Sequence, residues 1–297
     1  MSTIHNYLEL VRAPAILTVL GDTLAGGSAA GHPLSGRRFA LPLASACLYA
    51  GGMALNDYAD REIDSRERPE RPIPSGRIRA RNALAAAATL TVAGLGLSAV
   101  GGGRRALAVG APLAVSIWTY DLLAKNHPVF GSLTMGSCRA LDVLMGAGSA
   151  HLRPALGAAG IMGGHTVAVT LLSRGEVNGT TTTTASGVAA GTALLAGSVA
   201  TGALKAGAGR PTWVLSVLAA VAAYAARCAP AQLRAAGNPD AMNALVATKA
   251  GIRAMIPLQA ALTLRHGNSA AAAVLAAVDL GGKILRSGPR SRRISES

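Results

Sequence analysis

Three aspartates recur at helical spacing in the segment 56–64, which reads NDYADREID. If a helix continues through this segment, Asp57, Asp60 and Asp64 lie on one face, because they are three and four residues apart, and Asn56 lies beside Asp60. Three carboxylates on one stripe repel each other, so the arrangement is costly unless they share a cation. Hard oxygen ligands at this density suit Mg²⁺, which also binds water and phosphate oxygens. The segment is therefore a candidate magnesium site.

The position of this stripe along the chain narrows the chemistry further. The stripe follows directly on an apolar run, so it lies where a membrane helix would meet water. An amphiphile with an apolar tail and a charged head would lie at the same boundary. The alternative interpretation is that the carboxylates are solvated charges at a helix end, balanced by Arg61 and Arg66.

The elements that must position the stripe are membrane helices. The chain is 51% hydrophobic and 14% charged, with a mean hydropathy of +0.38, which is too apolar for an ordinary soluble domain. One helical crossing needs roughly 20 mostly apolar residues. We expect spans at 13–31, 38–55, 82–103, 105–120, 131–151, 154–172, 185–204, 211–228, 243–264 and 268–285. The ninth contains Lys249 and Arg253, so it could be partly re-entrant or interfacial.

Charge placement predicts how the chain is oriented. The net charge is +14, but the arginines concentrate in loops between spans, which the positive-inside rule explains without a nucleic-acid partner. The most basic loop is 56–81, so we expect a multi-pass protein of the plasma membrane with its motif loops and amino terminus in the cytoplasm. The three cysteines lack metal-ligand spacing and are interpreted as core residues. We expect one domain over 1–285 and a basic, disordered tail over 286–297.

The stripe and the loop after it resemble a known family. Residues 71–78 read RPIPSGRI, and a later loop, 120–125, reads YDLLAK. Together with the Asn-Asp-x-x-Asp-x-x-x-Asp pattern, these segments resemble the UbiA superfamily of intramembrane prenyltransferases. The resemblance implies an all-α bundle of nine to ten transmembrane helices around a central cavity. It also implies that Mg²⁺ bridges a prenyl diphosphate to Asn56, Asp57, Asp60 and Asp64.

The resemblance also implies roles for residues outside the stripe. Arg71 and Lys125 would neutralise the diphosphate, and metal and cations together would stabilise charge on the leaving group. Tyr120, with Trp118 nearby, is the candidate π-face for an allylic cation, and would be catalytic together with Asp57, Asp60 and Asp64. The alternative for Tyr120 is an aromatic residue at the membrane interface.

The family's second acidic motif is degenerate in this chain. After the sixth span the sequence reads LLSRGEV (171–177), with one carboxylate where the pattern has two or more. Either Glu176 alone helps to hold a metal, or Arg174 binds the diphosphate in place of a second ion. Ser173, Glu176 and Asp22, in the first span, form a possible second site.

A further pair of charges lies inside the fifth span, at Arg139 and Asp142 within CRALD (138–142). Buried ions in hydrocarbon usually pair and often mark function. Arg139 is a candidate diphosphate ligand, and a purely structural pair is the alternative. This segment and Ser173-Arg174-Gly175-Glu176 resemble the divergent EboC-like branch of the superfamily. His165, in the sixth span, is interpreted as a hydrogen bonder between helices.

The leading functional hypothesis is Mg²⁺-dependent transfer of an isoprenyl group from its diphosphate to an unidentified acceptor. The alternative is a non-catalytic prenyl-lipid binding or transport protein that keeps the diphosphate site, which the degenerate second motif and an aromatic content of only 3% favour. A channel or secondary transporter fits less well, because transporters place ionisable groups near the midplane, whereas the densest acidic cluster here lies at a helix end. The sequence identifies the lipid bilayer but no protein partner.

Overall fold

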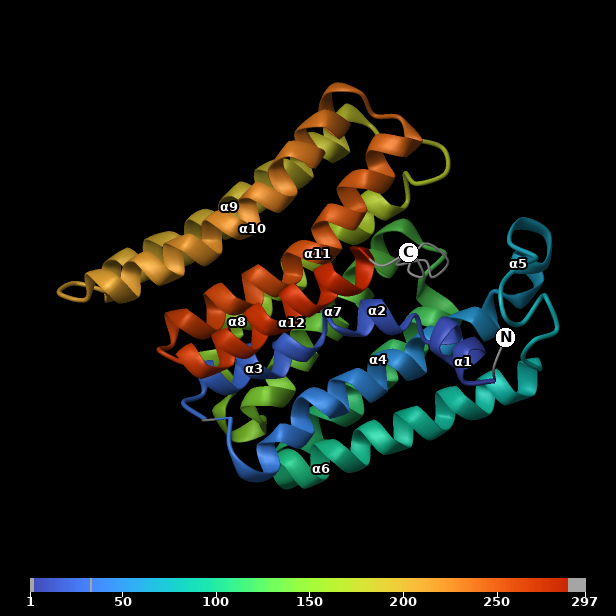
Figure 1. Ribbon diagram of the computed structural model, residues 1–297, viewed down its shortest axis with the longest axis horizontal. Helices are drawn as coiled ribbons and strands as arrows, with labels where there is room; N and C mark the ends of the chain where they lie inside the picture. Colours follow the sequence, from blue (N-terminus) through green and yellow to red (C-terminus); the bar gives the residue numbers. More distant parts are fainter. Residues whose placement is uncertain (1–2, 33, 288–297) are drawn as a thin grey trace.

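The computed structural model describes residues 3–32 and 34–287, and within these ranges the chain is helical and contains no strand. Three short elements, η1 (Gly36–Phe39), η2 (Tyr120–Ala124) and η3 (Ser149–His151), lie between longer helices. The longer helices, shown in Figure 1, are α1 (Thr3–Leu10), α2 (Ala13–Ile16), α3 (Leu20–Ala29), α4 (Ala40–Ala59), α5 (Arg61–Glu67), α6 (Ala80–Thr119), α7 (Pro128–Ala147), α8 (Leu152–Ser173), α9 (Thr182–Ala206), α10 (Pro211–Gly237), α11 (Ala241–Arg265) and α12 (Ser269–Ser287).

The segment α6 contains two antiparallel helices rather than one. Gly103 adopts φ 66° and ψ −159°, a conformation open to glycine and strained for residues with a side chain. The indole nitrogen of Trp118 donates a hydrogen bond to the hydroxyl of Thr91, at 3.2 Å, so the chain has turned back on itself. The separate spans predicted at 82–103 and 105–120 are therefore confirmed.

The helices fit an integral membrane protein. Five helical segments within the described residues are long and apolar enough to cross a membrane, and one of them, Ala80–Ala124, holds both halves of the α6 hairpin. Together with the other long helices, these segments are roughly consistent in number with the nine to ten predicted crossings. Several helices are longer than the predicted spans, most clearly α10, which continues to Gly237, whereas the predicted span ended at residue 228. The predicted ninth span forms one continuous helix, α11.

The first predicted span, 13–31, is broken. α2 ends at Ile16 and α3 begins at Leu20, which frees backbone groups at membrane depth. The carbonyl oxygen of Thr18 accepts hydrogen bonds from Arg139 Nη2 and Gln259 Nε2, each at 2.7 Å. A broken helix is tolerated in the membrane only where such partners are supplied, so these two side chains make the break possible.

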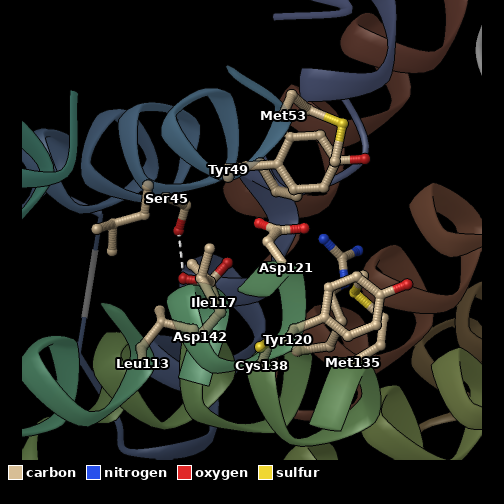
Figure 2. A pocket seen from close by; sticks show the side chains of 14 residues that line it. Ser45, Tyr49, Met53, Leu113, Ile117, Tyr120, Asp121, Met135, Cys138 and Asp142 are labelled. Atoms are coloured by element: carbon tan, nitrogen blue, oxygen red, sulfur yellow. Dashed lines mark hydrogen bonds between the residues drawn. The ribbon is translucent and has the colours of Figure 1, made fainter. Parts of the chain in front are cut away.

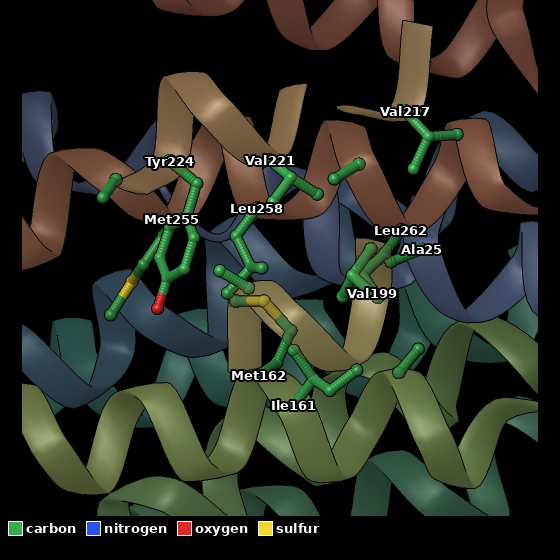
Figure 3. Packing of buried hydrophobic residues seen from close by; sticks show 14 of the residues in the cluster. Ala25, Ile161, Met162, Val199, Val217, Val221, Tyr224, Met255, Leu258 and Leu262 are labelled. Carbon is green, nitrogen blue, oxygen red and sulfur yellow. The ribbon is translucent and has the colours of Figure 1, made fainter. Parts of the chain in front are cut away.

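The two largest clusters of buried hydrophobic residues lie on either side of α3. One joins α8, α9, α10 and α11, where Met162, Tyr224 and Leu258 are fully buried (Figure 3). The other joins α4, α6 and α7 around Leu48 and Met145. α3 contacts α4, α7, α8 and α11, and so connects the clusters. The single domain over 1–285 stays a prediction. α12 runs to residue 287, and residues 288–297 of the predicted tail lie outside the described residues.

The loop between α5 and α6 is tied to the amino-terminal helix. Arg77 donates two hydrogen bonds to the carboxylate of Glu9 in α1, at 2.5 and 2.9 Å. These bonds raise the pKa of the Arg77 guanidinium. α1, α5 and the first turns of α6 therefore lie at the same end of the bundle, at the right of Figure 1, and cover the end of α4 that carries the acidic stripe.

Candidate active site

The acidic stripe forms as its spacing predicts. The amide nitrogen of Asp60 donates to the carbonyl of Asn56 at 2.9 Å, and that of Asp64 to the carbonyl of Asp60 at 2.8 Å, so helical geometry continues from α4 into α5. Asp57 and Asp64 are each only 4% exposed. These carboxylates are therefore not solvated charges at a helix end.

Two arginines neutralise the buried members of the stripe. Arg71 Nη1 lies 2.7 Å from Asp64 Oδ2 and 3.5 Å from Asp57 Oδ1, so one nitrogen bridges both carboxylates. Arg12 Nη2 lies 3.2 Å from the same Oδ1 of Asp57. Because these side chains are largely shielded from water, the pairs interact more strongly than exposed ion pairs do.

A lysine serves the other side of the stripe. Lys125 Nζ lies 2.5 Å from Asp60 Oδ1 and 3.3 Å from the amide oxygen of Asn56. Arg174 Nη1 donates to the backbone carbonyl of Lys125 at 3.3 Å, which places the predicted substitute for a second metal beside the lysine. The structure thus brings together Arg71, Lys125 and Arg174 with the first motif.

Arg12 was not among the residues singled out from the sequence. It has φ 48° and ψ 54°, and is the one non-glycine residue with positive φ in the described part of the chain. Such a conformation costs of order 1–3 kcal/mol and persists only where the surroundings hold it. The only sequence signal was a lone arginine directly before the first span.

The predicted magnesium ligands divide into two pairs. Within residues 3–32 and 34–287, no group of three or more His, Cys, Asp or Glu side chains is arranged to hold a metal ion. Asp57 and Asp64 nevertheless converge on one cationic atom, Arg71 Nη1, while Asn56 and Asp60 both face Lys125 Nζ. All four supply hard oxygen atoms, so their chemistry fits Mg²⁺ whose shell is completed by phosphate oxygens and water.

A polar cavity of about 340 Å³ opens beside Asp57. Glu176, from the degenerate second motif, lines the same cavity, so the structure brings both motifs together. Burial raises the pKa of Glu176, and the nearby Lys249 opposes this shift. The rest of the lining carries four cations, Arg12, Arg68, Arg71 and Lys249, and two further carboxylates, Glu9 and Glu70.

An apolar cavity of about 50 Å³ lies on the other side of the stripe, one helical turn below it on α4. Tyr49 and Met53 from α4 face Tyr120 and Met135 across this space, and Asp121 points between the two tyrosines (Figure 2). Tyr120 therefore lines a cavity. Trp118 does not accompany it, because its indole packs within the α6 hairpin.

The buried charges of the fifth span have other partners than predicted. Arg139 Nη1 pairs with Asp22 Oδ2 at 2.9 Å, and Asp142 accepts a hydrogen bond from the Ser45 hydroxyl at 2.5 Å. Gln259 Nε2 donates to Asp22 Oδ1 at 2.7 Å. Arg139 contacts no carboxylate of the stripe, and its role as a diphosphate ligand is not supported by this geometry.

Two further predicted residues lie apart from the site. The Ser173 hydroxyl donates to the backbone carbonyl of Thr170 in its own helix, at 2.9 Å, and Ser173 is not on the lining of the polar cavity. His165 lies between the Tyr224 hydroxyl and the Gly251 carbonyl, 3.0 Å from each, which confirms its helix-packing role.

The sequence matches a known family over most of its length. The sequence model of the UbiA prenyltransferase family matches residues 16–245. A digeranylgeranylglyceryl phosphate synthase of Methanopyrus kandleri is 35% identical over 149 residues, which cover 47% of this chain and 53% of that protein. One of the same name from Ignicoccus hospitalis is 40% identical over 146 residues, covering 48% and 46%. The chain spans about half the length of these curated relatives.

Solved structures share the fold. One concerns digeranylgeranylglyceryl phosphate synthase in membranes; it has a TM-score of 0.57 and 18% identity and covers 90% of this chain and 99% of that one. Another is a UbiA homolog from Archaeoglobus fulgidus bound to DMAPP and Mg²⁺, with a TM-score of 0.57, 13% identity, and coverage of 93% and 98%. The predicted all-α fold around a cavity is thereby confirmed.

Proposed function

The chain belongs to the UbiA prenyltransferase family, and from this we propose that it transfers an isoprenyl group from a prenyl diphosphate to an acceptor within the membrane, using Mg²⁺. The observation that carries the proposal is the arrangement of Asp57, Asp60 and Asp64, each paired with a cation, between a polar and an apolar cavity. An amphiphile with a phosphorylated head fits that arrangement. Membership of the EboC-like branch stays a prediction.

The cations of the stripe supply the charge that the diphosphate needs. Arg12, Arg71 and Lys125 hold carboxylates by ion pairs, and phosphate oxygens would compete for the same nitrogens. Asn56, Asp57, Asp60 and Asp64 would hold Mg²⁺, which stabilises negative charge on the leaving diphosphate. We propose that these carboxylates and cations form a ternary arrangement with the metal and the diphosphate.

The apolar cavity suits the carbon skeleton of the donor. Gly52 and Asp121, which line it, lie one helical turn from Asn56 and Lys125. Tyr49 and Tyr120 present aromatic rings there, which stabilise positive charge through their π-faces. As the bond between the allylic carbon and the diphosphate oxygen breaks, these rings shield the carbon from water until the acceptor's nucleophile bonds to it and loses its proton.

We propose a phosphorylated lipid alcohol as the acceptor class. The polar cavity carries Arg68 and Lys249 in addition to Arg12 and Arg71, so a second phosphate group would find cations there besides those that hold the stripe. The relatives' name, digeranylgeranylglyceryl phosphate synthase, points to a product with a glyceryl phosphate head. A glyceryl phosphate monoether is therefore the first acceptor to test.

The proposal is tested by measuring release of diphosphate and the formation of prenylated product, with and without EDTA. The substrates are prenyl diphosphates of several lengths and a glyceryl phosphate monoether or a cell lipid extract. Asp57→Ala and Asp60→Ala should abolish metal-dependent diphosphate release. Asp279→Ala is the matched control, because Asp279 also forms a partly buried ion pair, with Arg227, away from both cavities. Full activity in both stripe variants would defeat the proposal.

The alternative function is retention of the diphosphate site without turnover. It is supported by the second motif, where Glu176 is the single carboxylate on the polar cavity from that loop. Tight, metal-dependent binding of a prenyl diphosphate with no product from any acceptor would favour it. A prenylated product identified by mass spectrometry would eliminate it.

A further inference from the structure

Asp121 is a buried carboxylate that the structure leaves without a partner. It is 4% exposed and points into the apolar cavity between Tyr49 and Tyr120 (Figure 2). In the described part of the chain, neither of its oxygens takes part in a hydrogen bond or an ion pair. The other buried aspartates have such partners: Asp22, Asp57, Asp64 and Asp142. An unpaired carboxylate in these surroundings is costly, and ionisable residues inside a membrane usually serve a function.

The carboxylate of Asp121 lies at the boundary between the stripe and the apolar cavity. A side chain at Gly52 would come within 3.6 Å of Asp121 Oδ2, so this oxygen lies against α4 at that residue. Asn56, the first residue of the stripe, is one helical turn further along α4. A donor with its diphosphate at the stripe and its carbon chain in the cavity has its allylic carbon at this boundary. Asp121 therefore faces the bond that reacts.

The helix is widened where it carries Asp121. η2 is a π-helical turn, in which the amide nitrogen of Lys125 donates to the carbonyl of Tyr120, five residues back, at 2.9 Å. Such turns are rare and frequently mark functional sites. Tyr120 and Asp121 both line the cavity, whereas the Lys125 side chain is paired with Asp60. The stripe thus occupies the lysine, and the carboxylate of Asp121 remains available to a bound molecule.

We propose that Asp121 takes the proton from a hydroxyl group of the acceptor, so that the acceptor reacts through oxygen. This inference rests on the proposed function, since it assumes that the donor binds at the stripe. The bond between the allylic carbon and the diphosphate oxygen breaks, and its electron pair leaves with the diphosphate. A lone pair of the acceptor oxygen forms the new bond to carbon, and the hydroxyl proton moves to Asp121. The neutral carboxyl group releases this proton to water after the product has left.

The test compares Asp121→Asn with the unaltered protein in lipid nanodiscs, with Mg²⁺, prenyl diphosphates and a cell lipid extract supplemented with a glyceryl phosphate monoether. Asparagine keeps the shape of the side chain but is a poor base. We expect the rate of prenyl ether formation to fall about a hundredfold to ten-thousandfold, the usual contribution of a general base, with unchanged equilibrium affinity for the donor. Asp121→Glu should retain part of the rate. Added formate should restore part of it in Asp121→Ala, because formate supplies a carboxylate to the vacated space.

Asp142→Asn is the matched control, because it makes the same change in another aspartate of the cavity lining, whose carboxylate already accepts a hydrogen bond from Ser45. This variant should keep most of the rate. Equal losses in Asp121→Asn and Asp142→Asn would overturn the inference. An undiminished rate in Asp121→Asn would overturn it as well, and so would a loss of donor affinity as large as the loss of rate.

The product separates this inference from the proposed function. Mass spectrometry and NMR identify whether the prenyl group is attached to oxygen or to carbon. Attachment to carbon would overturn the inference while leaving prenyl transfer intact. If the unaltered protein forms no prenylated product with Mg²⁺, the proposed function fails and the inference fails with it.

Discussion

At the scale of single residues, Arg71 has the central position in the site. Its Nη1 atom bridges Asp57 and Asp64, which lie about two helical turns apart on the stripe. When a diphosphate arrives, this guanidinium can exchange carboxylate oxygens for phosphate oxygens over a short distance. We therefore propose that Arg71 couples the state of the acidic stripe to the presence of the donor.

Replacing Arg71 should weaken donor binding. Arg71→Ala removes a charged hydrogen-bond donor, and such bonds contribute about 1.5–3 kcal/mol, or about tenfold to a hundredfold in affinity. Arg71→Lys should lose less affinity, because lysine keeps the positive charge and lacks only the second hydrogen-bonding nitrogen of the guanidinium group. Equilibrium binding of a prenyl diphosphate measures both. Unchanged affinity in Arg71→Ala would show that the diphosphate lies elsewhere.

The burial of Glu176 predicts how the stability of the protein depends on pH. Burial raises the pKa of this carboxyl above its ordinary value, so ionising it is less favourable in the folded chain than in the unfolded chain. The stability that follows is present below the ordinary glutamate range and is lost as the pH rises through the raised pKa. Relative to Glu176→Gln, the unaltered protein should thus become less stable as pH rises. Thermal unfolding in detergent at a series of pH values measures the difference in stability between the two proteins. A difference that stays constant with pH would contradict the prediction.

At the scale of elements, close packing of α3 against α7 positions the buried ion pair between Asp22 and Arg139. A side chain at Gly26 would overlap the carbonyl of Val143, and one at Gly146 would overlap the carbonyl of Thr23. Small residues let membrane helices approach until their backbones touch. This contact brings Asp22 on α3 to Arg139 on α7.

Gly146→Ala should therefore destabilise the fold. The added methyl group forces α3 and α7 apart, and overpacking of this kind costs about 1–3 kcal/mol. Gly157→Ala in α8 is the matched control, because a methyl group there meets open space. Unfolding temperatures of both variants in detergent give the comparison. Equal unfolding temperatures for the two variants would contradict the packing argument.

The elements also show what the sequence could and could not predict. Runs of apolar residues predicted nearly all spans, including the two halves of α6, because each crossing needs a minimum apolar length. The break at residues 17–19 was missed, since its hydrogen-bond donors, Arg139 and Gln259, come from distant helices. For the same reason Asp22 was left without a partner and Arg139 was assigned to the diphosphate. The spacing of neighbouring residues was enough to predict the acidic stripe. Contacts between residues far apart in the sequence could be identified only in the folded structure.

At the scale of the whole molecule, the helices place the chain's loops at two ends of the bundle. The stripe, Lys125 and Arg174 lie at one end, as their contacts show. We propose that this end faces the cytoplasm and that the protein lies in the plasma membrane, because the most basic loop, 56–81, belongs to this end.

Cysteine accessibility tests that orientation. In a background without Cys47, Cys138 and Cys228, the changes Ser65→Cys and Thr182→Cys should react with a membrane-impermeant reagent only from the cytoplasmic side. Ser35→Cys and Ala208→Cys, at the exposed loops of the opposite end, should react only from outside. Labelling of Ser65→Cys in intact cells would contradict the proposed sidedness.

The most direct test of the central claim is the interdependence of metal and donor binding. Every carboxylate of the stripe is engaged by a cation, so Mg²⁺ alone should bind weakly, and the diphosphate alone must compete with those carboxylates. When Mg²⁺ and the diphosphate are both present, the phosphate oxygens can pair with the cations of the stripe while the carboxylates bind the metal. Calorimetric titration of a prenyl diphosphate with and without Mg²⁺ should therefore show strongly cooperative binding, which Asp57→Asn reduces. Equal donor affinity in Mg²⁺ and in EDTA would contradict the account.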